Sequence, residues 1–80
     1  MANIVLGITK EKDTGEFKVV WSENGKYSEA KTYYTDSDLD AVLTMKDTAL
    51  RAISAGNKVS ISTNALTSKL ARKYFTKWVE

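Results

Sequence analysis

The residues best suited to bind an anion lie in the C-terminal segment of the chain, from Asn64 to Glu80. Four cations follow one another there before any acidic residue: Lys69, Arg72, Lys73 and Lys77. Their spacing of three, one and four residues places them on one side of a helix. Ammonium and guanidinium groups in such a row can contact the phosphates of a nucleic acid or the carboxylates of a protein. The other side of the helix is apolar and suited to close a core: Leu66, Leu70, Ala71, Tyr74, Phe75 and Trp78.

Three interpretations of this cationic face stay open at the level of the sequence. It is a solvated helix face, a site that docks on an acidic protein with Tyr74 or Trp78 as an anchor, or a site that contacts phosphates. A second binding face is expected on the sheet, where basic and aromatic residues alternate with core positions: Lys18, Tyr27, Lys31 and Tyr33. Such a face can stack bases, as RNA-binding sheets do, and it can equally be ordinary cross-strand packing.

The sequence offers few residues for catalysis or metal binding. It contains no histidine and no cysteine, which removes the commonest general base, thiolate chemistry and disulfides. Asp36, Asp38 and Asp40 imitate the start of a calcium-binding loop, but Ala41 stands where that loop requires glycine. Acidic residues at the N-terminus of a helix explain this cluster better. We therefore expect a protein that is not an enzyme and that has no cofactor and no metal.

Six predicted elements position these side chains, in the order β-β-β-α-β-α. Apolar residues alternate in two segments, 3–9 and 16–22, which we predict to be strands. Asn24-Gly25 follows and predicts a type I′ turn, so a third strand from Lys26 to about Tyr34 should pair back along the second. In that register residues 27, 29, 31 and 33 lie on the open face of the sheet, away from the core.

The first helix is predicted to run from about residue 38 to Ala55, with Ser37 as its N-cap and Gly56 as its left-handed end. Its core-facing stripe is expected to contain Leu39, Val42, Leu43, Ala49, Leu50 and Ile53. Lys46 interrupts this stripe. Its stem lies over the core with the ammonium group at the rim, or it is a buried amine that pairs with a carboxylate or binds an anion.

A short strand at 58–62 and a final helix, capped by Thr63 or Asn64, complete the chain. The strand–helix–strand connection places the fourth strand beside the first, which predicts the sheet order 3-2-1-4. The sequence therefore predicts one domain over residues 1–80, with a two-layer α+β fold. Its four-stranded, mostly antiparallel sheet should carry both helices on one face and leave the other face open.

The net charge of +2 is unevenly distributed along the chain. Residues 1–40 hold five lysines against eight acidic residues, a net charge of −3, whereas residues 41–80 carry a net charge of +5. Such a molecule could orient on an anionic surface. The sequence contains no apolar stretch long enough to span a membrane, and Met1–Leu6 lacks the pattern of a signal peptide. We therefore expect a cytoplasmic protein without a membrane partner.

These observations predict a small regulatory protein that acts by docking on a macromolecule, with a protein partner favoured over a nucleic acid. Inhibitors, adaptors and small accessory proteins of phages are of this kind. The alternative is nucleic-acid binding by the basic C-terminal helix. A homodimer through an unpaired sheet edge is a further route. The β-β-β-α order of the first 55 residues is similar to the three-stranded DNA-binding domains at integrase N-termini, in element order and in no signature residue.

Overall fold

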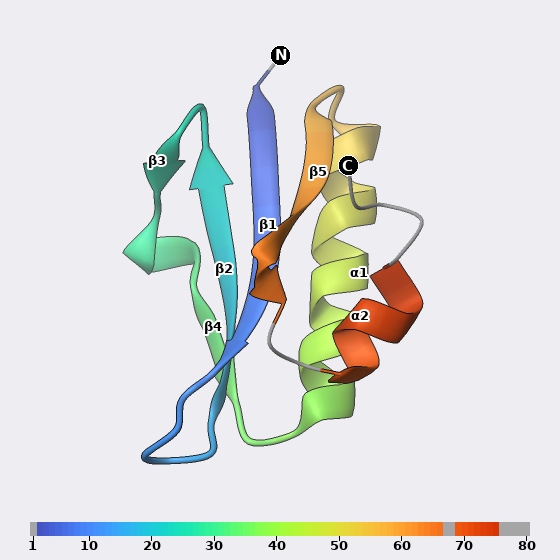
Figure 1. Ribbon diagram of the computed structural model, residues 1–80. Coiled ribbons are helices and arrows are strands. Elements are labelled where there is room, and N and C mark those ends of the chain that lie inside the picture. The colour runs from blue at the N-terminus through green and yellow to red at the C-terminus, as the bar shows by residue number, and fades with distance from the viewer. Residues whose placement is uncertain (1, 67–68, 76–80) are drawn as a thin grey trace.

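One mixed sheet organises the chain in the computed structural model, which describes residues 2–66 and 69–75 (Figure 1). The strand order is β3-β2-β1-β5, and β4 also pairs with β2. β5 runs parallel to β1, and the other pairs are antiparallel. The α+β fold and the strand order confirm the prediction, with β3 and β4 together in place of the third strand. The elements are β1 (Asn3–Lys10), β2 (Phe17–Glu23), β3 (Lys26–Tyr27), the 3₁₀ turn η1 (Glu29–Lys31), β4 (Tyr33–Thr35), α1 (Asp38–Ser54), β5 (Lys58–Leu66) and α2 (Lys69–Phe75).

The hydrophobic core lies between one face of the sheet and α1. Ile4, Leu6 and Ile8 occupy alternate positions of β1 and are almost completely buried. Phe17 and Val19 continue this face on β2, as the alternation of the sequence predicted. The helices and β5 supply the remaining buried residues: Ala41, Val42, Met45, Ala49, Ala52, Ile61, Ala71 and Phe75.

Both ends of α1 have the caps that the sequence predicted. The Oγ of Ser37 accepts a hydrogen bond from the backbone N–H of Asp40, at 3.2 Å. This bond satisfies one of the N–H groups that have no partner within the helix. After the last turn, Gly56 adopts a φ of +88°, a left-handed conformation that costs glycine less than other residues.

The predicted third strand is broken in the middle, and this break changes which residues share a face. The type I′ turn is present and places Tyr27 opposite Ser22, as predicted. The turn η1 then interrupts the strand, and Val19 pairs with Tyr33 three residues later than a continuous strand would allow. Because side chains alternate between faces, an odd shift moves every following residue to the opposite face. Tyr33 therefore lies on the core side and Tyr34 on the open face, which reverses the prediction.

The last strand is longer than predicted. β5 continues to Leu66, so Thr63 and Asn64 belong to a strand and do not cap a helix. Leu6 pairs with Ile61 and Ile8 pairs with Leu66, so β1 advances by two residues while β5 advances by five. This irregularity is a bulge, which bends a strand away from its partner. The prediction of a helix from residue 64 is therefore wrong up to Leu66.

α2 fills the space beside the bent part of β5. Figure 1 shows it next to α1 at the β5 edge of the sheet. Ala71 and Phe75 are its buried residues and belong to the same core that α1 covers. The two helices therefore cover the same hydrophobic core, as predicted, although α2 lies at the edge of the sheet. In the part of the chain that the structure describes, no helix is long and apolar enough to cross a membrane.

Candidate docking surfaces

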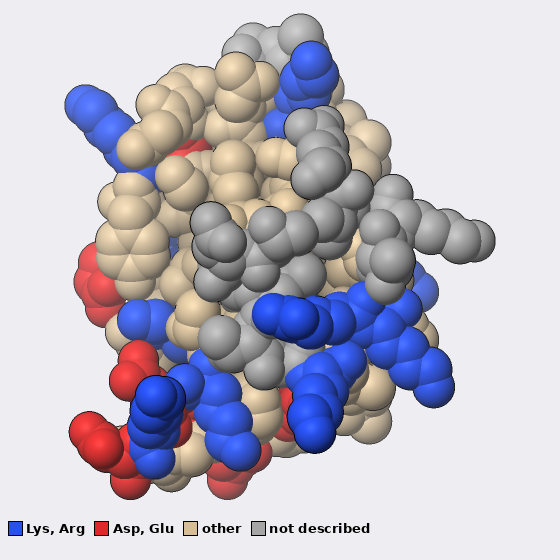
Figure 2. All heavy atoms as spheres, viewed as in Figure 1, with Lys and Arg blue, Asp and Glu red and all other residues tan. Residues whose placement is uncertain are grey.

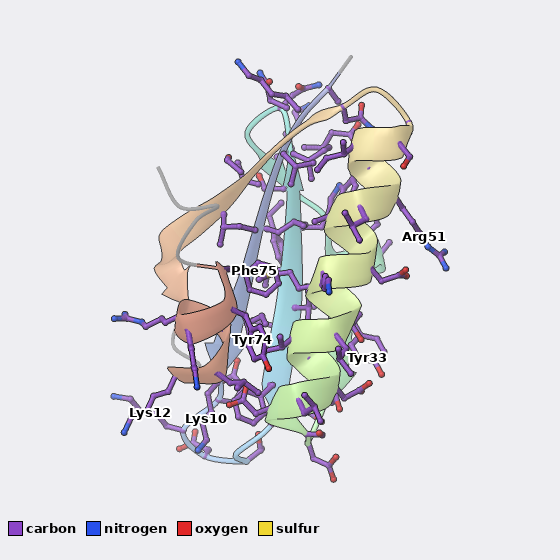
Figure 3. All side chains as sticks on the ribbon, turned by 90° about the vertical axis from the view of Figure 1, so that its right-hand side faces the viewer. Lys10, Lys12, Tyr33, Arg51, Tyr74 and Phe75 are labelled. Atoms are coloured by element: carbon purple, nitrogen blue, oxygen red, sulfur yellow. The ribbon has the colours of Figure 1, made fainter. Side chains whose placement is uncertain are left out.

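The cations that the sequence assigned to the last helix are exposed on α2. Lys69, Arg72 and Lys73 lie on its outer side, whereas Lys77 is outside the described residues. Figure 3 shows Lys10 and Lys12, from the end of β1 and its following loop, below α2 in that view, whereas Figure 1 places this loop at the lower left, apart from α2. Figure 2 shows blue atoms across the lower part of this face, with acidic atoms at its left and lower edges. We call Lys10, Lys12, Lys69, Arg72 and Lys73 the basic surface.

The second predicted binding face does not exist as one surface. Lys18 and Tyr27 remain on the open face, and Lys18 forms an ion pair with Glu11 at 3.6 Å. Tyr33 lies on the other side of the sheet because η1 shifts the register, and its hydroxyl donates to the Oδ2 of Asp40 at 2.6 Å. This bond raises the pKa of Tyr33 and lowers the pKa of Asp40.

Lys31 also departs from the predicted face. Its Nζ lies 4.5 Å from the centroid of the Trp21 ring and 3.8 Å from the Oε1 of Glu23. A cation over an indole ring is attracted by the negative charge density of the ring face. Trp21 belongs to the side of β2 that carries the core residues, so Lys31 covers the rim of the core. A base-stacking platform that combines the four predicted residues is therefore not formed.

A carboxylate between two tyrosines occupies the open face in place of that platform. The hydroxyl of Tyr27 donates to Glu29 at 2.7 Å, and the hydroxyl of Tyr34 donates to the other carboxylate oxygen at 2.8 Å. Hydrogen bonds to the charged form, that from Tyr27 first, lower the pKa of Glu29. The bond to Glu29 raises the pKa of Tyr34 to about 12. This arrangement, which we call the Glu29 clamp, holds the turn η1.

α1 buries Met45 and its smaller apolar side chains and exposes its leucines and Ile53. The buried residues are Ala41, Val42, Met45, Ala49 and Ala52. The predicted core stripe is therefore correct at Val42 and Ala49 and wrong at its four larger members, which are 46–55% exposed: Leu39, Leu43, Leu50 and Ile53. Alanine side chains let a helix lie close to the sheet, and this close approach turns the neighbouring leucines out of the core. Together with Lys46, the four exposed residues form what we call the α1 seam.

A groove between α1 and α2 borders the N-terminal half of the seam. Its lining is mostly apolar and its volume is about 170 Å³, with walls formed by Leu39, Val42, Leu43, Lys46, Tyr74 and Phe75. Figure 3 shows Tyr74 and Phe75 directed from α2 toward α1. Phe75 is buried at the base, whereas Tyr74 is 61% exposed and belongs to the open part of the wall. We call this feature the α1–α2 groove.

Lys46 is the only charged side chain in the lining of this groove that the structure describes. It is exposed, so the interpretation of a buried amine is wrong. Among the described residues it forms no ion pair, whereas Asp47 is paired with Arg51 at 3.0 Å. The ammonium group of Lys46 is therefore available to an acidic group of another molecule.

The seam could have been found in the sequence from its spacing. Leu39, Leu43, Lys46, Leu50 and Ile53 follow one another at intervals of four, three, four and three residues. That repeat is the pattern of a helix that packs against a second helix. Beside it, Ala41, Ala49 and Ala52 follow one another at helical spacing and mark a second apolar face. The predicted core stripe combined residues of both faces and placed the larger side chains in the core.

The acidic residues that imitate a calcium loop do not meet in space. α1 begins at Asp38, so the segment is helical where a loop would be required. Among residues 2–66 and 69–75, no group of three or more acidic side chains is close enough to hold a metal ion.

Three comparisons with known proteins returned nothing similar: no family model matches the sequence, no curated protein is significantly similar to it, and no solved structure matches its fold. The function must therefore be argued from the surfaces of this chain.

Proposed function

We propose that this protein is a non-enzymatic binding protein that docks on a partner protein through the α1 seam and Tyr74. The observation that carries the proposal is the orientation of α1, which places four large apolar side chains on the surface. Contiguous exposed apolar residues with a polar border mark interaction sites on soluble proteins. A partner that covers the exposed half of each leucine gains on the order of 1 kcal/mol per side chain.

A charge placed in the seam tests this proposal directly. Leu43→Asp and Leu50→Asp each replace an apolar contact with a carboxylate that a partner would have to bury. Removing a charge from water costs several kcal/mol, even with Lys46 close by. We expect both variants to lose the proteins that the wild type captures from cells expressing the gene. Ala30→Asp is the matched control, because it adds the same charge on the exposed turn η1, outside the seam.

Far-UV circular dichroism and thermal unfolding establish that the variants are folded before capture is compared. Both seam positions are about half exposed, so little loss of stability is expected. Capture of the same proteins by the wild type and by both seam variants would refute docking through the seam.

A second candidate function is nucleic-acid binding through the basic surface. The observation that favours it is the spread of Lys and Arg atoms across the lower part of one face, which extends beyond α2 (Figure 2). Phosphate contacts by such a cluster add affinity that does not depend on sequence and that falls with salt. The two candidates use different residues, so they can be separated by mutation.

A further inference from the structure

We propose that the α1 seam and the α1–α2 groove are the seat of one amphipathic α-helix of the partner protein, with acidic residues beside its apolar stripe. This inference rests on the proposed function and names the chemistry of the partner. Three features of the described residues support it: the spacing of the seam, the shape of the groove and the distribution of charge.

The spacing of the seam selects a helix as the occupant. Side chains at alternating intervals of three and four residues form holes that accept the side chains of a facing helix. The seam extends from Leu39 to Ile53, which corresponds to about 21 Å along the axis at about 1.5 Å per residue. An occupant of about 15 residues, or two heptads, matches this length. An extended strand presents side chains at intervals of two and cannot follow this pattern along one face.

The groove adds a second wall at one end of the seam. Tyr74 stands on α2 and faces Leu39 and Leu43 of α1 across an opening of about 170 Å³. An apolar side chain of the occupant can enter between these walls, with Phe75 at the base. Tyrosine is well suited to such a position because it offers a large rigid surface and a polar hydroxyl at its tip.

The charges around the groove favour an acidic occupant. Lys46 stands in the middle of the seam, and α2 carries three exposed cations on its outer side. No acidic residue is among the described residues that line the groove. Asp47 of α1 is paired with Arg51, and Asp40 accepts a hydrogen bond from Tyr33 but keeps its charge. Glutamates or aspartates beside the apolar stripe of the partner would meet Lys46, whereas lysines at the same places would be repelled.

A second copy of this chain fits the seam less well. Two seams that overlap fully in an antiparallel, two-fold symmetric pair bring their middle residues together at the axis. Lys46 is that middle residue, so two ammonium groups would approach each other in an apolar interface. Like charges in such a position oppose association.

Two synthetic peptides of opposite charge test the proposal on the full-length protein. Both have 18 residues with leucine at the heptad a and d positions, and they differ in carrying glutamate or lysine at all flanking positions. We expect the glutamate peptide to bind at least about tenfold more tightly than the lysine peptide, which corresponds to about 1.4 kcal/mol. Isothermal titration calorimetry measures both dissociation constants.

Three variants connect this preference to the groove. Lys46→Glu should reverse the order of the two peptides, whereas Lys26→Glu, at the far hairpin, should leave it unchanged. Leu43→Asp should abolish binding of both peptides, and Leu43→Ser serves the same purpose if the aspartate variant fails to fold. If Lys46→Glu and Lys26→Glu have the same effect, or if Leu43→Asp still binds, the seam is not the site.

The remaining outcomes distinguish this inference from the proposed function. If neither peptide binds but capture of cellular partners still depends on Leu43, docking stands and the helical occupant is wrong. If analytical ultracentrifugation shows a dimer that Leu43→Asp converts to a monomer, a second copy is the occupant. If the glutamate peptide binds only after Trp78→Ser, the chain's own C-terminal residues are the occupant and the inference fails.

Discussion

At the scale of single residues, Glu29 holds the irregular part of the sheet edge. Its two carboxylate oxygens accept hydrogen bonds from Tyr27 and Tyr34, which lie on either side of the turn η1 in the sequence. A charged acceptor makes such bonds shorter and stronger than bonds between neutral groups. The Glu29 clamp therefore ties β3 to β4 across the residues that shift the register.

The ionisation of Tyr34 should report this clamp. The hydrogen bond to Glu29 raises the pKa of Tyr34 from 10.0 to about 12. Because the pKa is raised in the folded state, the stabilisation is complete below about pH 10 and is lost as the pH rises toward 12. An absorbance titration at 295 nm should show a late step whose amplitude Tyr34→Phe reduces and Tyr74→Phe retains, because Tyr33, whose pKa is also raised, still contributes to it. A late step of unchanged amplitude in Tyr34→Phe would contradict the clamp.

At the scale of elements, the orientation of α1 determines both the core and the candidate site. Met45 is completely buried, whereas Leu43, two residues earlier, is 55% exposed. Met45→Ala should therefore lower the free energy of unfolding by about 2–5 kcal/mol, because it leaves a cavity in the core. Leu43→Ala should change it by about 0.5 kcal/mol or less. Urea denaturation measures both, and the opposite ranking would restore the stripe that the sequence analysis predicted.

The elements that the sequence predicted correctly are those whose signals are local. Alternating apolar residues located β1 and β2, and Asn24-Gly25 fixed the turn between β2 and β3. The third strand failed because its break depends on side-chain hydrogen bonds from Tyr27 and Tyr34 to Glu29, which leave no mark on the alternation of apolar residues. β5 was underestimated because Ser62, Thr63 and Asn64 are polar, and polar residues carry no alternation that distinguishes a bulged strand from a helix start.

The candidate site was predictable in part for the same reason. The cations of α2 were read from their spacing, and Lys69, Arg72 and Lys73 are exposed as expected. The seam was missed because α1 has two apolar faces. Only the packing against the sheet decides which of the two faces the core. Alanines lowered the apparent hydrophobicity of the face that is buried.

At the scale of the whole molecule, the two candidate surfaces lie near each other. α2 contributes Tyr74 to the groove and exposes Lys69, Arg72 and Lys73 on its outer side. Lys46 lines the groove, and α2, which forms its other wall, exposes three cations, so their charge would steer an acidic partner toward the seam. Apolar contact and charge thus favour the same side of the molecule.

Salt dependence separates an acidic protein partner from a nucleic acid. If the five cations of the basic surface each contact a phosphate of duplex DNA, the logarithm of affinity should fall with the logarithm of salt concentration with a slope of about −4 to −5. Lys69→Glu with Lys73→Glu should then reduce this slope, whereas Leu43→Asp should leave it unchanged. A gel-shift series from 50 to 200 mM salt measures this slope, because affinity should fall by about 10²-fold or more over that range.

No shift at the lowest salt concentration would eliminate nucleic-acid binding. A steep slope together with partner capture that does not respond to Leu43→Asp would replace the protein-docking proposal, because the seam would then have no part in binding.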